Sequence, residues 1–485
     1  MPTLEQKKLF VEKIKERVAK GKGGVRVKKK KKTNNDQNND SGSEDYDDID
    51  EEDPKDYCRG GYHPMRIGEI LNNNRYHVVH KLGWGYFSTV WLCWDAIESR
   101  FVAVKVQKSA IDFQDSALDE IDIFKQLCDK YKSGAANPND VDSCPIVALL
   151  DSFSFRGING KHICLVFEVM GENLLSLIRE YDYKGIPLDR VRVIMRHVLQ
   201  GLDLMHRQCS IIHTDLKPEN VIQKQPSSKI VQIMKSYKRP PKSGVPLTER
   251  KDLENLTKSQ LKKLKRKLKA SEGAPASTEP QEETTQQELS NEPQVAKESE
   301  NQEYDLPAFN DKKDDEGVKI MDFGNSCWID KQFTDDVQTR QYRAPEVILG
   351  AKYSTPIDIW SLACVAFELA TGDFLFDPRE SRGVPRDEDH LALIIELVGE
   401  DNFPVKSRCT GNAWHHFFDK NGRLRHIDRL KIFKMEPLLL EKYKFEPDDA
   451  KQFADFLSGM LIVNPHQRHT ASKLLQHEFL NKASV

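Results

Sequence analysis

The chain has 485 residues, of which 31% are charged and 38% hydrophobic, and its formal net charge is -3. Because positive and negative charges nearly balance, composition predicts no affinity for nucleic acid or membrane surfaces, and charge-based recognition must come from local clusters. The nine cysteines form no C-x-x-C pair, so we expect reduced thiols and no structural zinc. No apolar run is long enough to cross a bilayer, and residues 1–22 lack a signal-peptide pattern. We therefore expect neither membrane insertion nor secretion.

Near the start of the chain Phe10, Ile14 and Val18 have helical spacing, which fits either an amphipathic partner-binding helix or a short, fraying one. The rest of residues 1–55 contains few apolar side chains. A basic run, Lys28–Lys32, precedes an Asn- and Asp-rich tract and an acidic block, Ser43–Asp53. Such a composition buries too little apolar surface to offset the entropy of ordering, so we predict a disordered N-terminal tail. The lysine run has two interpretations, a nuclear-import signal and a merely solvated tail.

Apolar alternation begins at Tyr76. It predicts three successive strands at Tyr76–Lys81, Val90–Asp95 and Phe101–Lys108, which would form a small β-rich lobe. The first two strands flank Gly83-Trp84-Gly85-Tyr86-Phe87-Ser88-Thr89-Val90. This stretch matches a Gly-rich phosphate-binding loop, except that Ser88 replaces the third glycine.

Lys105 ends the tetrapeptide Val-Ala-Val-Lys in the third strand. Its spacing from the Gly-rich loop is that of a lysine that contacts the α and β phosphates of a nucleotide. A lone lysine is more often a surface residue, but apolar neighbours would bury this stem, which favours a functional role. The expected partner is Glu120, which we prefer to Asp119 because it is in register with Ile121 and Phe124 on one predicted helix; the alternative is a solvated acidic face.

The stretch His213-Thr214-Asp215-Leu216-Lys217-Pro218-Glu219-Asn220 is the most informative motif. Asp322-Phe323-Gly324 and Ala344-Pro345-Glu346 follow it, an ordered series that chance almost never builds. The series resembles that of protein kinases, with Thr214 in place of the usual Arg. By that resemblance Asp215 would accept or orient the substrate hydroxyl, Lys217 would neutralise the transferring phosphoryl group, and Asn220 and Asp322 would bind Mg²⁺.

Thr214 also bears on regulation. In kinases that carry Arg at this position, a phosphorylated activation loop commonly balances its charge, and Thr removes that charge. The segment from Asp322 to Glu346 contains no Thr-x-Tyr phosphoacceptor motif. We therefore predict an enzyme that does not depend on phosphorylation of its activation loop.

The region from Lys224 to Glu316 is rich in Lys, Glu, Gln, Ser and Pro and poor in aromatic residues. It separates Asn220 from Asp322 by roughly 100 positions, whereas a compact hairpin needs roughly a dozen or two. We therefore predict a disordered insert looping out between two adjacent strands. Within it, the leucines of Leu253–Leu268 have near-helical spacing, which fits either a partner-docking helix or a transient solvated one.

The C-terminal half supplies a structural framework. Asp358-Ile359-Trp360-Ser361 is expected to anchor a central helix, and Arg468 is expected to form a buried ion pair with Glu346. Phe167 would be the bulky residue ahead of a hinge, Glu168-Val169-Met170, whose backbone meets adenine; the alternative for Phe167 is plain core packing.

Four stretches, IIHTDLKPENV, DFGNSCWIDKQFT, QTRQYRAPEVILG and RDEDHLALIIELVG, together with the large insert, closely resemble the SR protein kinases. The resemblance covers residues 57–223 and 317–482. It implies an α+β, bilobal protein-kinase fold with a small β-rich N-lobe and a larger helical C-lobe. The expected organisation is a tail (1–55), the N-lobe, hinge and catalytic loop (56–223), the insert (224–316), the C-lobe with activation segment and docking region (317–482), and a short end (483–485).

The resemblance implies ATP and Mg²⁺ as cofactors, and it assigns roles to sets of residues. The catalytic set is Asp215, Lys217, Lys105 and Glu120, and the metal set is Asn220 and Asp322. The nucleotide set is Leu82, Gly83, Gly85, Val90, Ala103, Lys105, Glu168 and Met170. The set expected to contact the protein substrate is Arg340, Arg343, Asp373, Asp389, Glu396 and Lys442.

A physical argument supports part of the docking set. Asp387, Glu388 and Asp389 lead into a predicted helix, and Glu396 lies two turns after Asp389 on the same face, where carboxylates would meet arginine-rich peptides. The alternative is that these acidic residues only complement the macrodipole of the helix, which explains Glu396 poorly. Phe323 and Ala344-Pro345 depart from the pattern of the SR protein kinases. Both are the generic kinase forms, and they point to a distant member of that family.

Three functions are compared. The leading hypothesis is a constitutively active Ser/Thr kinase for Arg/Ser-rich splicing factors, cytoplasmic and nuclear, acting in pre-mRNA splicing and splicing-factor localisation. The expected partners are those substrates, and chaperones that would bind the insert, with no direct nucleic acid, no membrane and a monomeric state. The second hypothesis is another CMGC-type kinase with Ser-Pro or dual specificity. The third, a pseudokinase scaffold, is disfavoured by intact Lys105, Asp215, Asn220 and Asp322.

Overall fold

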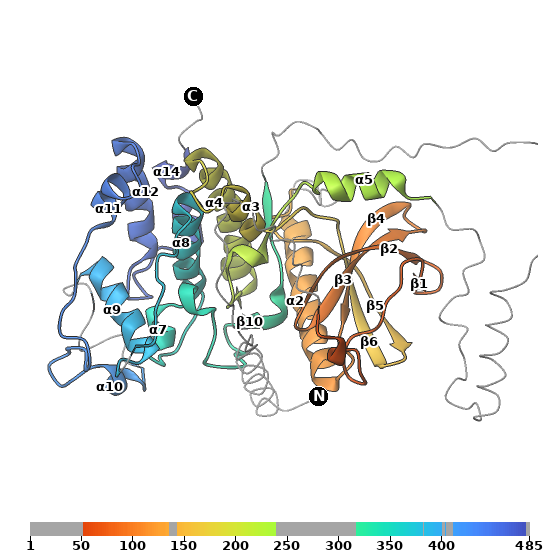
Figure 1. Cartoon of the computed structure of the whole chain (residues 1–485), viewed down its shortest axis with the longest axis horizontal. Helices are drawn as coiled ribbons and strands as arrows, with labels where there is room; N and C mark the ends of the chain where they lie inside the picture. Colours follow the sequence, from red (N-terminus) through yellow and green to blue (C-terminus); the bar gives the residue numbers. More distant parts are fainter. Residues whose placement is uncertain are drawn as a thin grey trace, which may run out of the picture.

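The computed structural model describes residues 52–134, 143–238, 317–381, 383–399, 403 and 411–481. They form a β-rich lobe and a helical lobe side by side (Figure 1), and the predicted bilobal α+β fold is confirmed. No helix in these ranges is long and apolar enough to cross a membrane. Residues 1–51, 239–316 and 482–485 lie outside the described residues, so most of the predicted tail and insert is not tested.

The β-rich lobe is a six-stranded antiparallel sheet in the order β1-β2-β3-β4-β6-β5. The three predicted strands are present as β2, β3 and β4, and β2 runs on through the first two glycines of the Gly-rich loop. The strands are β1 (Ile70–Leu71), β2 (Tyr76–Gly85), β3 (Ser88–Asp95), β4 (Arg100–Gln107), β5 (Leu149–Gly157) and β6 (Gly160–Phe167).

Helix α2 (Ile111–Gly134) follows β4 in the chain and packs against both lobes. Its residues Ala117, Glu120, Ile121, Ile123, Phe124 and Leu127 are buried, at the helical spacing that the sequence predicted. In Figure 1 the helix lies between the sheet and the helical lobe. This position brings a helix face of the β-rich lobe against the strands that carry the catalytic motifs.

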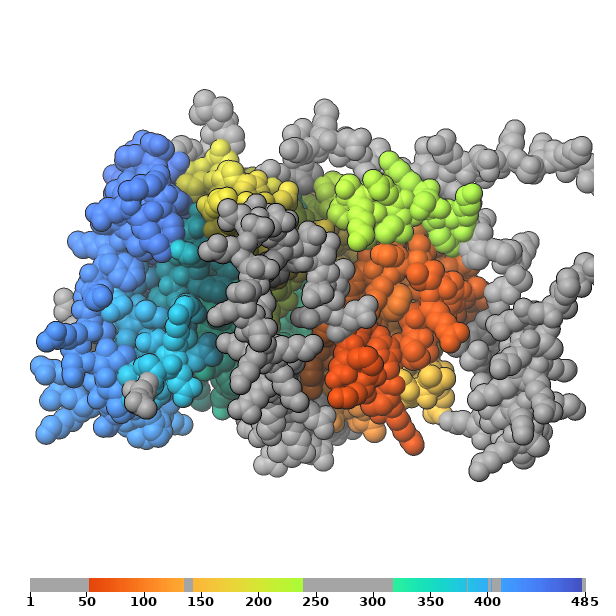
Figure 2. Space-filling view, in the orientation of Figure 1, coloured from red at the N-terminus to blue at the C-terminus, as the bar shows by residue number. Residues whose placement is uncertain are grey.

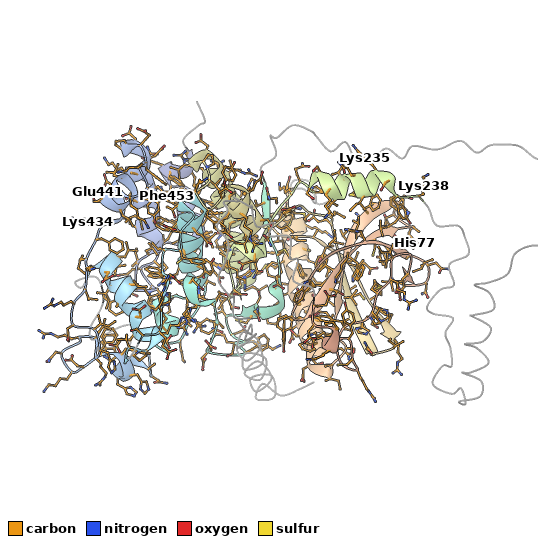
Figure 3. All side chains as sticks on the ribbon, in the orientation of Figure 1. His77, Lys235, Lys238, Lys434, Glu441 and Phe453 are labelled. Atoms are coloured by element: carbon orange, nitrogen blue, oxygen red, sulfur yellow. The ribbon has the colours of Figure 1, made fainter. Side chains whose placement is uncertain are left out.

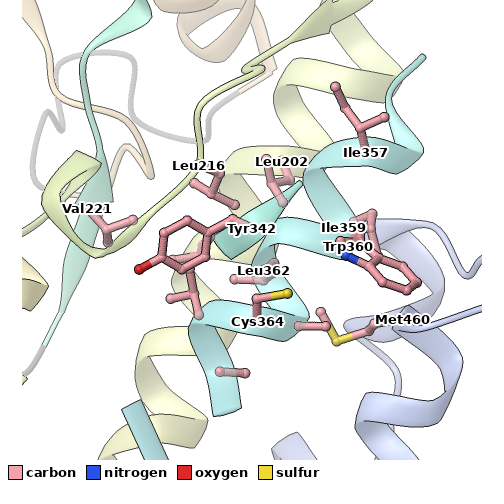
Figure 4. Packing of buried hydrophobic residues seen from close by; sticks show 14 of the residues in the cluster. Leu202, Leu216, Val221, Tyr342, Ile357, Ile359, Trp360, Leu362, Cys364 and Met460 are labelled. Carbon is pink, nitrogen blue, oxygen red and sulfur yellow. The ribbon is translucent and has the colours of Figure 1, made fainter. Parts of the chain in front are cut away.

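The helical lobe is built around α8 (Pro356–Thr371), in which every residue from Ile357 to Thr371 is buried. Figure 4 shows its side chains, including Trp360 and Leu362, among those of Leu202, Tyr342 and Met460. The other helices are α3 (Leu174–Glu180), α4 (Leu188–Asp203), α7 (Pro345–Ile348), α9 (Arg386–Val398), α10 (Trp414–Phe417), α11 (Met435–Glu441), α12 (Pro447–Met460), α13 (Ala471–Leu474) and α14 (Glu478–Asn481).

The predicted framework of this lobe is confirmed. The two terminal guanidinium nitrogens of Arg468, Nη1 and Nη2, donate to Oε1 and Oε2 of Glu346, at 2.8 and 2.9 Å, and both side chains are buried. The Arg468 guanidinium also lies over the Trp360 ring at 5.1 Å from its centroid. This pair fixes the end of the activation segment to the C-terminal part of the chain.

Two short antiparallel sheets carry the catalytic motifs. Strand β7 (Ile211–Ile212) pairs with β10 (Cys327–Trp328), and β8 (Val221–Gln223) pairs with β9 (Val318–Ile320). The Lys224 N–H donates to the Gly317 carbonyl at 2.9 Å. The two sides of the insert are thus adjacent, as predicted from the separation of the motifs.

The start of the insert corrects the prediction. Residues 224–238 are not a disordered stretch: α5 (Ser228–Ser236) lies over β3 and β4, and Met234 is buried with Leu92, Trp94 and Phe101. Its exposed face carries Lys235, with Lys238 just beyond its end (Figure 3). Ile230, Ile233, Met234 and Tyr237 form an apolar helical face, which the polar composition of the whole insert obscured.

The end of the predicted tail is also corrected. Residues 52–55 are ordered, and Pro54–Asp56 form a 3₁₀ turn capped by Asp53. Glu52 is buried and accepts from the Lys81 ammonium at 2.5 and 2.6 Å. The Glu52 carboxylate belongs to the acidic block that the sequence predicts to be disordered, but it is paired with Lys81 of β2.

Candidate active site

Lys105, Glu120 and Asp322 meet where the two lobes join. The Lys105 ammonium donates to both oxygens of Glu120, at 2.8 and 3.1 Å, and to Asp322 Oδ1 at 3.2 Å. Burial opposes the charge on Lys105, but the two carboxylates outweigh it and raise the pKa of Lys105. Burial would raise the pKa of Asp322, yet Lys105 holds it below its ordinary value. Glu120, rather than Asp119, is the partner, as the sequence predicted.

An aromatic column holds this arrangement in place. The Phe124 ring of α2 lies 4.7 Å from the Phe323 ring, edge to face, and 5.0 Å from the Phe167 ring. The His213 ring lies 5.5 Å from Phe323 and its Nε2 is 3.1 Å from the Met321 carbonyl. Phe167 therefore packs in the core in contact with the helix that carries Glu120.

Asp215 and Lys217 lie together in the catalytic loop after β7. The Lys217 ammonium donates to Asp215 Oδ2 at 2.8 Å, and the Thr339 hydroxyl donates to Asp215 Oδ1 at 2.7 Å. Lys217 also donates to Thr339 Oγ1 at 3.2 Å. Burial disfavours the ammonium, but Asp215 outweighs it and raises the pKa of Lys217. Lys217 thus stays charged beside the Asp215 carboxylate.

Asp358 of α8 sets the conformation of this loop. Its carboxylate accepts from the backbone N–H groups of His213 and Thr214, at 2.8 and 3.0 Å. Thr214 has a φ of 68°, a left-handed conformation that costs a non-glycine residue energy and persists only when the surroundings hold it. The buried Asp358 therefore has a direct catalytic-loop role that extends its predicted anchoring of the helix.

Thr214 is satisfied within the chain. Its hydroxyl donates to the Asn325 carbonyl at 2.8 Å, and its carbonyl accepts from the Gln338 N–H at 2.9 Å. The Gln338 amide in turn donates to Ser361 Oγ and the Ile357 carbonyl, at 2.7 and 2.9 Å. The position usually held by Arg thus joins the activation segment to the loop through neutral hydrogen bonds.

The apolar residues assigned to the nucleotide belong to one hydrophobic cluster. Ala103 is buried in it, and Leu82, Val90 and Met170 pack against it. The Glu168 side chain has another role: it accepts from the Lys319 ammonium at 2.7 Å and from the Ala148 N–H at 2.8 Å. Only the backbone of Glu168 is then available to the adenine base of a nucleotide, as expected for a hinge residue.

The side chains present fit a phosphate group and Mg²⁺. A Cβ added to Gly83 or Gly85 would meet no atom within 4 Å, so there is open space beside the Gly-rich loop. The Asn220 amide nitrogen donates to the Asp215 carbonyl at 2.8 Å, so the amide oxygen of Asn220 would be the atom that binds Mg²⁺, together with the Asp322 carboxylate. Among the described residues, no group of three or more His, Cys, Asp or Glu side chains gathers to hold a metal. Two protein ligands agree with Mg²⁺, which keeps waters and takes substrate phosphates.

The residues assigned to the protein substrate fall into several local contacts. Arg343 pairs with Asp336 at 3.0 Å, and Arg340 contacts Asp387. Burial, followed by the charges of Arg343 and Arg386, lowers the pKa of Arg340 to about 10. Arg340 and Arg343 of the activation segment and Arg386 at the start of α9 therefore form a crowded cationic group.

The acidic members of the docking set are held near backbone or lysine donors. Asp373 accepts from Lys442 at 2.9 Å, Asp389 from the Arg379 N–H at 2.8 Å, and Glu396 from the Lys431 N–H at 2.8 Å. Asp389 and Glu396 both lie on α9, as predicted. The structure brings Asp373 and Lys442 into contact and leaves the joint docking role of the set a prediction.

The sequence analysis missed three residues of the activation segment that organise the site. Thr339 joins Asp215 to Lys217, Gln338 joins Thr214 to α8, and the Trp328 indole donates to Gln126 of α2 at 2.8 Å. Thr339 and Gln338 stand five and six positions before Ala344, and this fixed spacing was their only signal. The Trp328 contact spans 202 positions and has no local signal.

The chain matches the protein kinase domain family over residues 76–234 and 309–480. It is 38% identical to SRSF protein kinase 3 of Homo sapiens and 40% identical to serine/threonine-protein kinase SRPK of Physarum polycephalum. Both matches cover 90% of this chain, and they cover 91% and 93% of those relatives. It is 39% identical to serine/threonine-protein kinase spk-1 of Caenorhabditis elegans, but spans only 51% of that longer protein. With its ordered catalytic motifs and their geometry, the chain belongs to the SR protein kinases, a group of serine/threonine protein kinases.

Proposed function

We propose that this kinase transfers the terminal phosphoryl group of ATP to serines in Arg/Ser-rich segments of splicing factors. The observation that carries the catalytic part is the assembled pair of clusters, Lys105–Glu120–Asp322 and Asp215–Lys217–Thr339. Asp215 would accept or orient the serine proton, and Lys217 would stabilise negative charge that develops on the transferred group. Mg²⁺, held by Asn220 and Asp322, would neutralise the phosphates when bound.

The proposed substrate class rests on charge and on relatives. Asp373, Asp389 and Glu396 offer carboxylates to arginines of the substrate, and the arginines Arg340 and Arg343 offer cations to serines that are already phosphorylated. The relatives include proteins named SRSF protein kinase 3. Arg-Ser specificity follows from this combination of an acidic docking set and a cationic group near the catalytic loop.

We also propose that the kinase is active without phosphorylation of its activation segment. Support comes from three contacts of that segment: Asn325 with Thr214 of the catalytic loop, Arg343 with Asp336 inside the segment, and Trp328 with Gln126 of α2. In this arrangement a carboxylate, rather than a phosphate, accompanies the arginine. The proposed location, cytoplasm and nucleus, is supported by the family and the Lys28–Lys32 run.

The test is the initial phosphorylation rate of protein expressed in bacteria and never exposed to another kinase. Matched peptides with Arg-Ser, Lys-Ser and Ser-Pro repeats are compared, with Asp215→Asn as the blank. High activity confined to Arg-Ser peptides is expected. A preference for Ser-Pro peptides would favour the second candidate, a Pro-directed kinase, and activity only after addition of an upstream kinase would overturn the constitutive part.

A further inference from the structure

The first described residues, Glu52–Tyr62, contact the Gly-rich loop through Tyr62. We call them the N-terminal strap; they form part of the surface of the β-rich lobe (red in Figure 2). The Tyr62 side chain is buried, and its hydroxyl donates to the Gly85 carbonyl at 2.8 Å and to the Tyr86 carbonyl at 3.3 Å. Burial raises the pKa of Tyr62 far above its ordinary value, so the hydroxyl remains a donor.

Lys108 joins the strap to the same loop from the other side. Its ammonium donates to Asp56 at 2.9 Å and lies over the rings of Tyr62 and Tyr86, at 4.3 and 4.6 Å from their centroids. Its backbone N–H donates to the Phe87 carbonyl at 2.9 Å. A buried ammonium between two rings is a strong cation–π arrangement, because little water competes for the charge. Lys108 therefore ties the turn Tyr86-Phe87 to the strap.

The N-terminal strap is hydrogen-bonded to the turn between β5 and β6. The Gly60 N–H donates to the Asn159 carbonyl at 3.0 Å, and the Asn159 amide donates to the Tyr62 carbonyl at 2.6 Å. A Cβ on Gly61 would come within 1.8 Å of the Asp56 carbonyl oxygen, so this close turn requires glycine. Because the strap is anchored to the β5–β6 hairpin, its contacts with the loop restrain the loop rather than follow it.

The same loop also reaches α2. The Phe87 and Phe113 rings lie 5.8 Å apart, and Phe113 is in the first turn of the helix that carries Glu120. The strap, the Gly-rich turn and α2 therefore form one contact chain that ends at the Lys105–Glu120 pair. Glycines in a phosphate loop give it freedom that must be lost when a nucleotide is held, and restraints already present reduce that loss.

We propose that the N-terminal strap is a positioning element of the nucleotide site, in which Tyr62 and Lys108 hold the Gly-rich loop in the conformation that cradles the phosphates. This inference rests on the proposed use of ATP but not on the proposed protein substrate. Tyr62 and Lys108 act through the loop and touch no reacting atom. Their effect is on the binding of nucleotide, not of peptide.

The experiment compares the variant Tyr62→Phe with the unaltered protein. This substitution is chosen because it removes only the hydroxyl. The lost hydrogen bond should raise the Kd for a non-hydrolysable MgATP analogue and the KM for ATP by about 3- to 10-fold. The KM for peptide should stay unchanged. Lys108→Met, which keeps most of the apolar stem, should raise the same two constants by at least as much.

Tyr76→Phe is the matched control. Tyr76 is also a buried tyrosine of the β-rich lobe, but its hydroxyl donates to Asp151, at 2.6 Å, away from the loop. The positioning role would be overturned if Tyr62→Phe had the same Kd for the analogue and the same KM for ATP as the unaltered protein, and lost only as much thermal stability as Tyr76→Phe. Equal rises in the KM for ATP and for peptide would overturn it too. Failure of the unaltered chain to bind the analogue would instead refute the proposed ATP site.

Discussion

At the scale of single residues, the site depends on hydroxyl and charge contacts between segments. Thr339 is the clearest case, because one hydroxyl donates to the proposed base, Asp215, and accepts from Lys217. Hydrogen bonds to charged groups contribute more than neutral ones, since the charge polarises the donor. Thr339 is therefore a positioning residue for both charged side chains.

Replacing Thr339 with Val keeps the shape and removes this hydroxyl. We expect kcat to fall roughly 10-fold or more, by analogy with the loss of a charge-assisted hydrogen bond, with little change in the KM for ATP. Steady-state kinetics on an Arg-Ser peptide measure both constants. Thr334→Val, in the same segment, is the control, because the Thr334 hydroxyl accepts from the Asp336 N–H at 3.2 Å and has no hydrogen bond with Asp215 or Lys217 among the described residues; equal kcat values in the two variants would refute the role.

Arg468 gives a prediction about stability. Arg468→Met removes one member of a buried ion pair and leaves the Glu346 carboxylate without its cation. We expect the free energy of unfolding to fall by about 3 to 5 kcal/mol. Denaturant titration measures the change. The double variant Arg468→Met/Glu346→Leu should recover part of the loss, and a double variant less stable than the single one would contradict this explanation.

At the scale of elements, α5 shows how a short segment of a polar region becomes structure. The helix is only nine residues long, too short to be stable by itself in water, so its stability must come from packing on β3 and β4. Met234 supplies the buried centre of that contact. The same dependence on a partner surface applies to the N-terminal strap.

The change Met234→Ala should therefore destabilise the β-rich lobe. Removing a buried Met side chain costs about 2 kcal/mol at the lower end of the usual range. Lys235→Ala, one position further on the exposed face, should change the free energy of unfolding by less than about 0.5 kcal/mol. Denaturant unfolding of both variants distinguishes a packed helix from a loosely attached one, for which the two changes would have equal effects.

At the scale of the whole molecule, two buried histidines make stability depend on pH. Burial, followed by the charges of Arg340, Arg343 and Arg386, lowers the pKa of His390 to about 3. Burial lowers the pKa of His162 to about 4, with His63 a minor contributor after the Gln107 hydrogen bond that opposes the shift. Neither ring nitrogen of His390 has a hydrogen-bond partner among the described residues.

The unfolded chain binds protons at these histidines below about pH 6.5, whereas the folded chain does not until far lower pH. Stability should therefore be complete above pH 6.5 and fall as the pH drops toward 4, by about 1 kcal/mol per histidine between pH 7.5 and 5.5. Thermal unfolding at the two pH values measures this. His390→Leu should reduce the dependence, the exposed His416→Gln should not, and an unchanged slope in His390→Leu would contradict the prediction.

Much of the site could be predicted from the sequence because its motifs are local. Asp215, Lys217 and Asn220 fall within six positions, so their spacing alone identifies the loop. Glu120 was identified because helical periodicity fixes which acidic residue shares a face with Ile121 and Phe124. The insert was recognised from composition, but its first fifteen residues were not, because composition averages over a short amphipathic helix.

The sequence by itself determined the family, the two lobes, and the order of the motifs that form the candidate site, since each depends on residue type at short, fixed spacing. Only the tertiary structure decided which side chains meet across long separations: Lys105 with Asp322 over 217 positions, Asp215 with Thr339 over 124, and Tyr62 with Gly85. These contacts depend on how the chain closes on itself. A hydrogen bond requires a donor–acceptor distance of about 2.7 to 3.2 Å, and no local sequence pattern specifies so narrow a range for residues far apart in the chain.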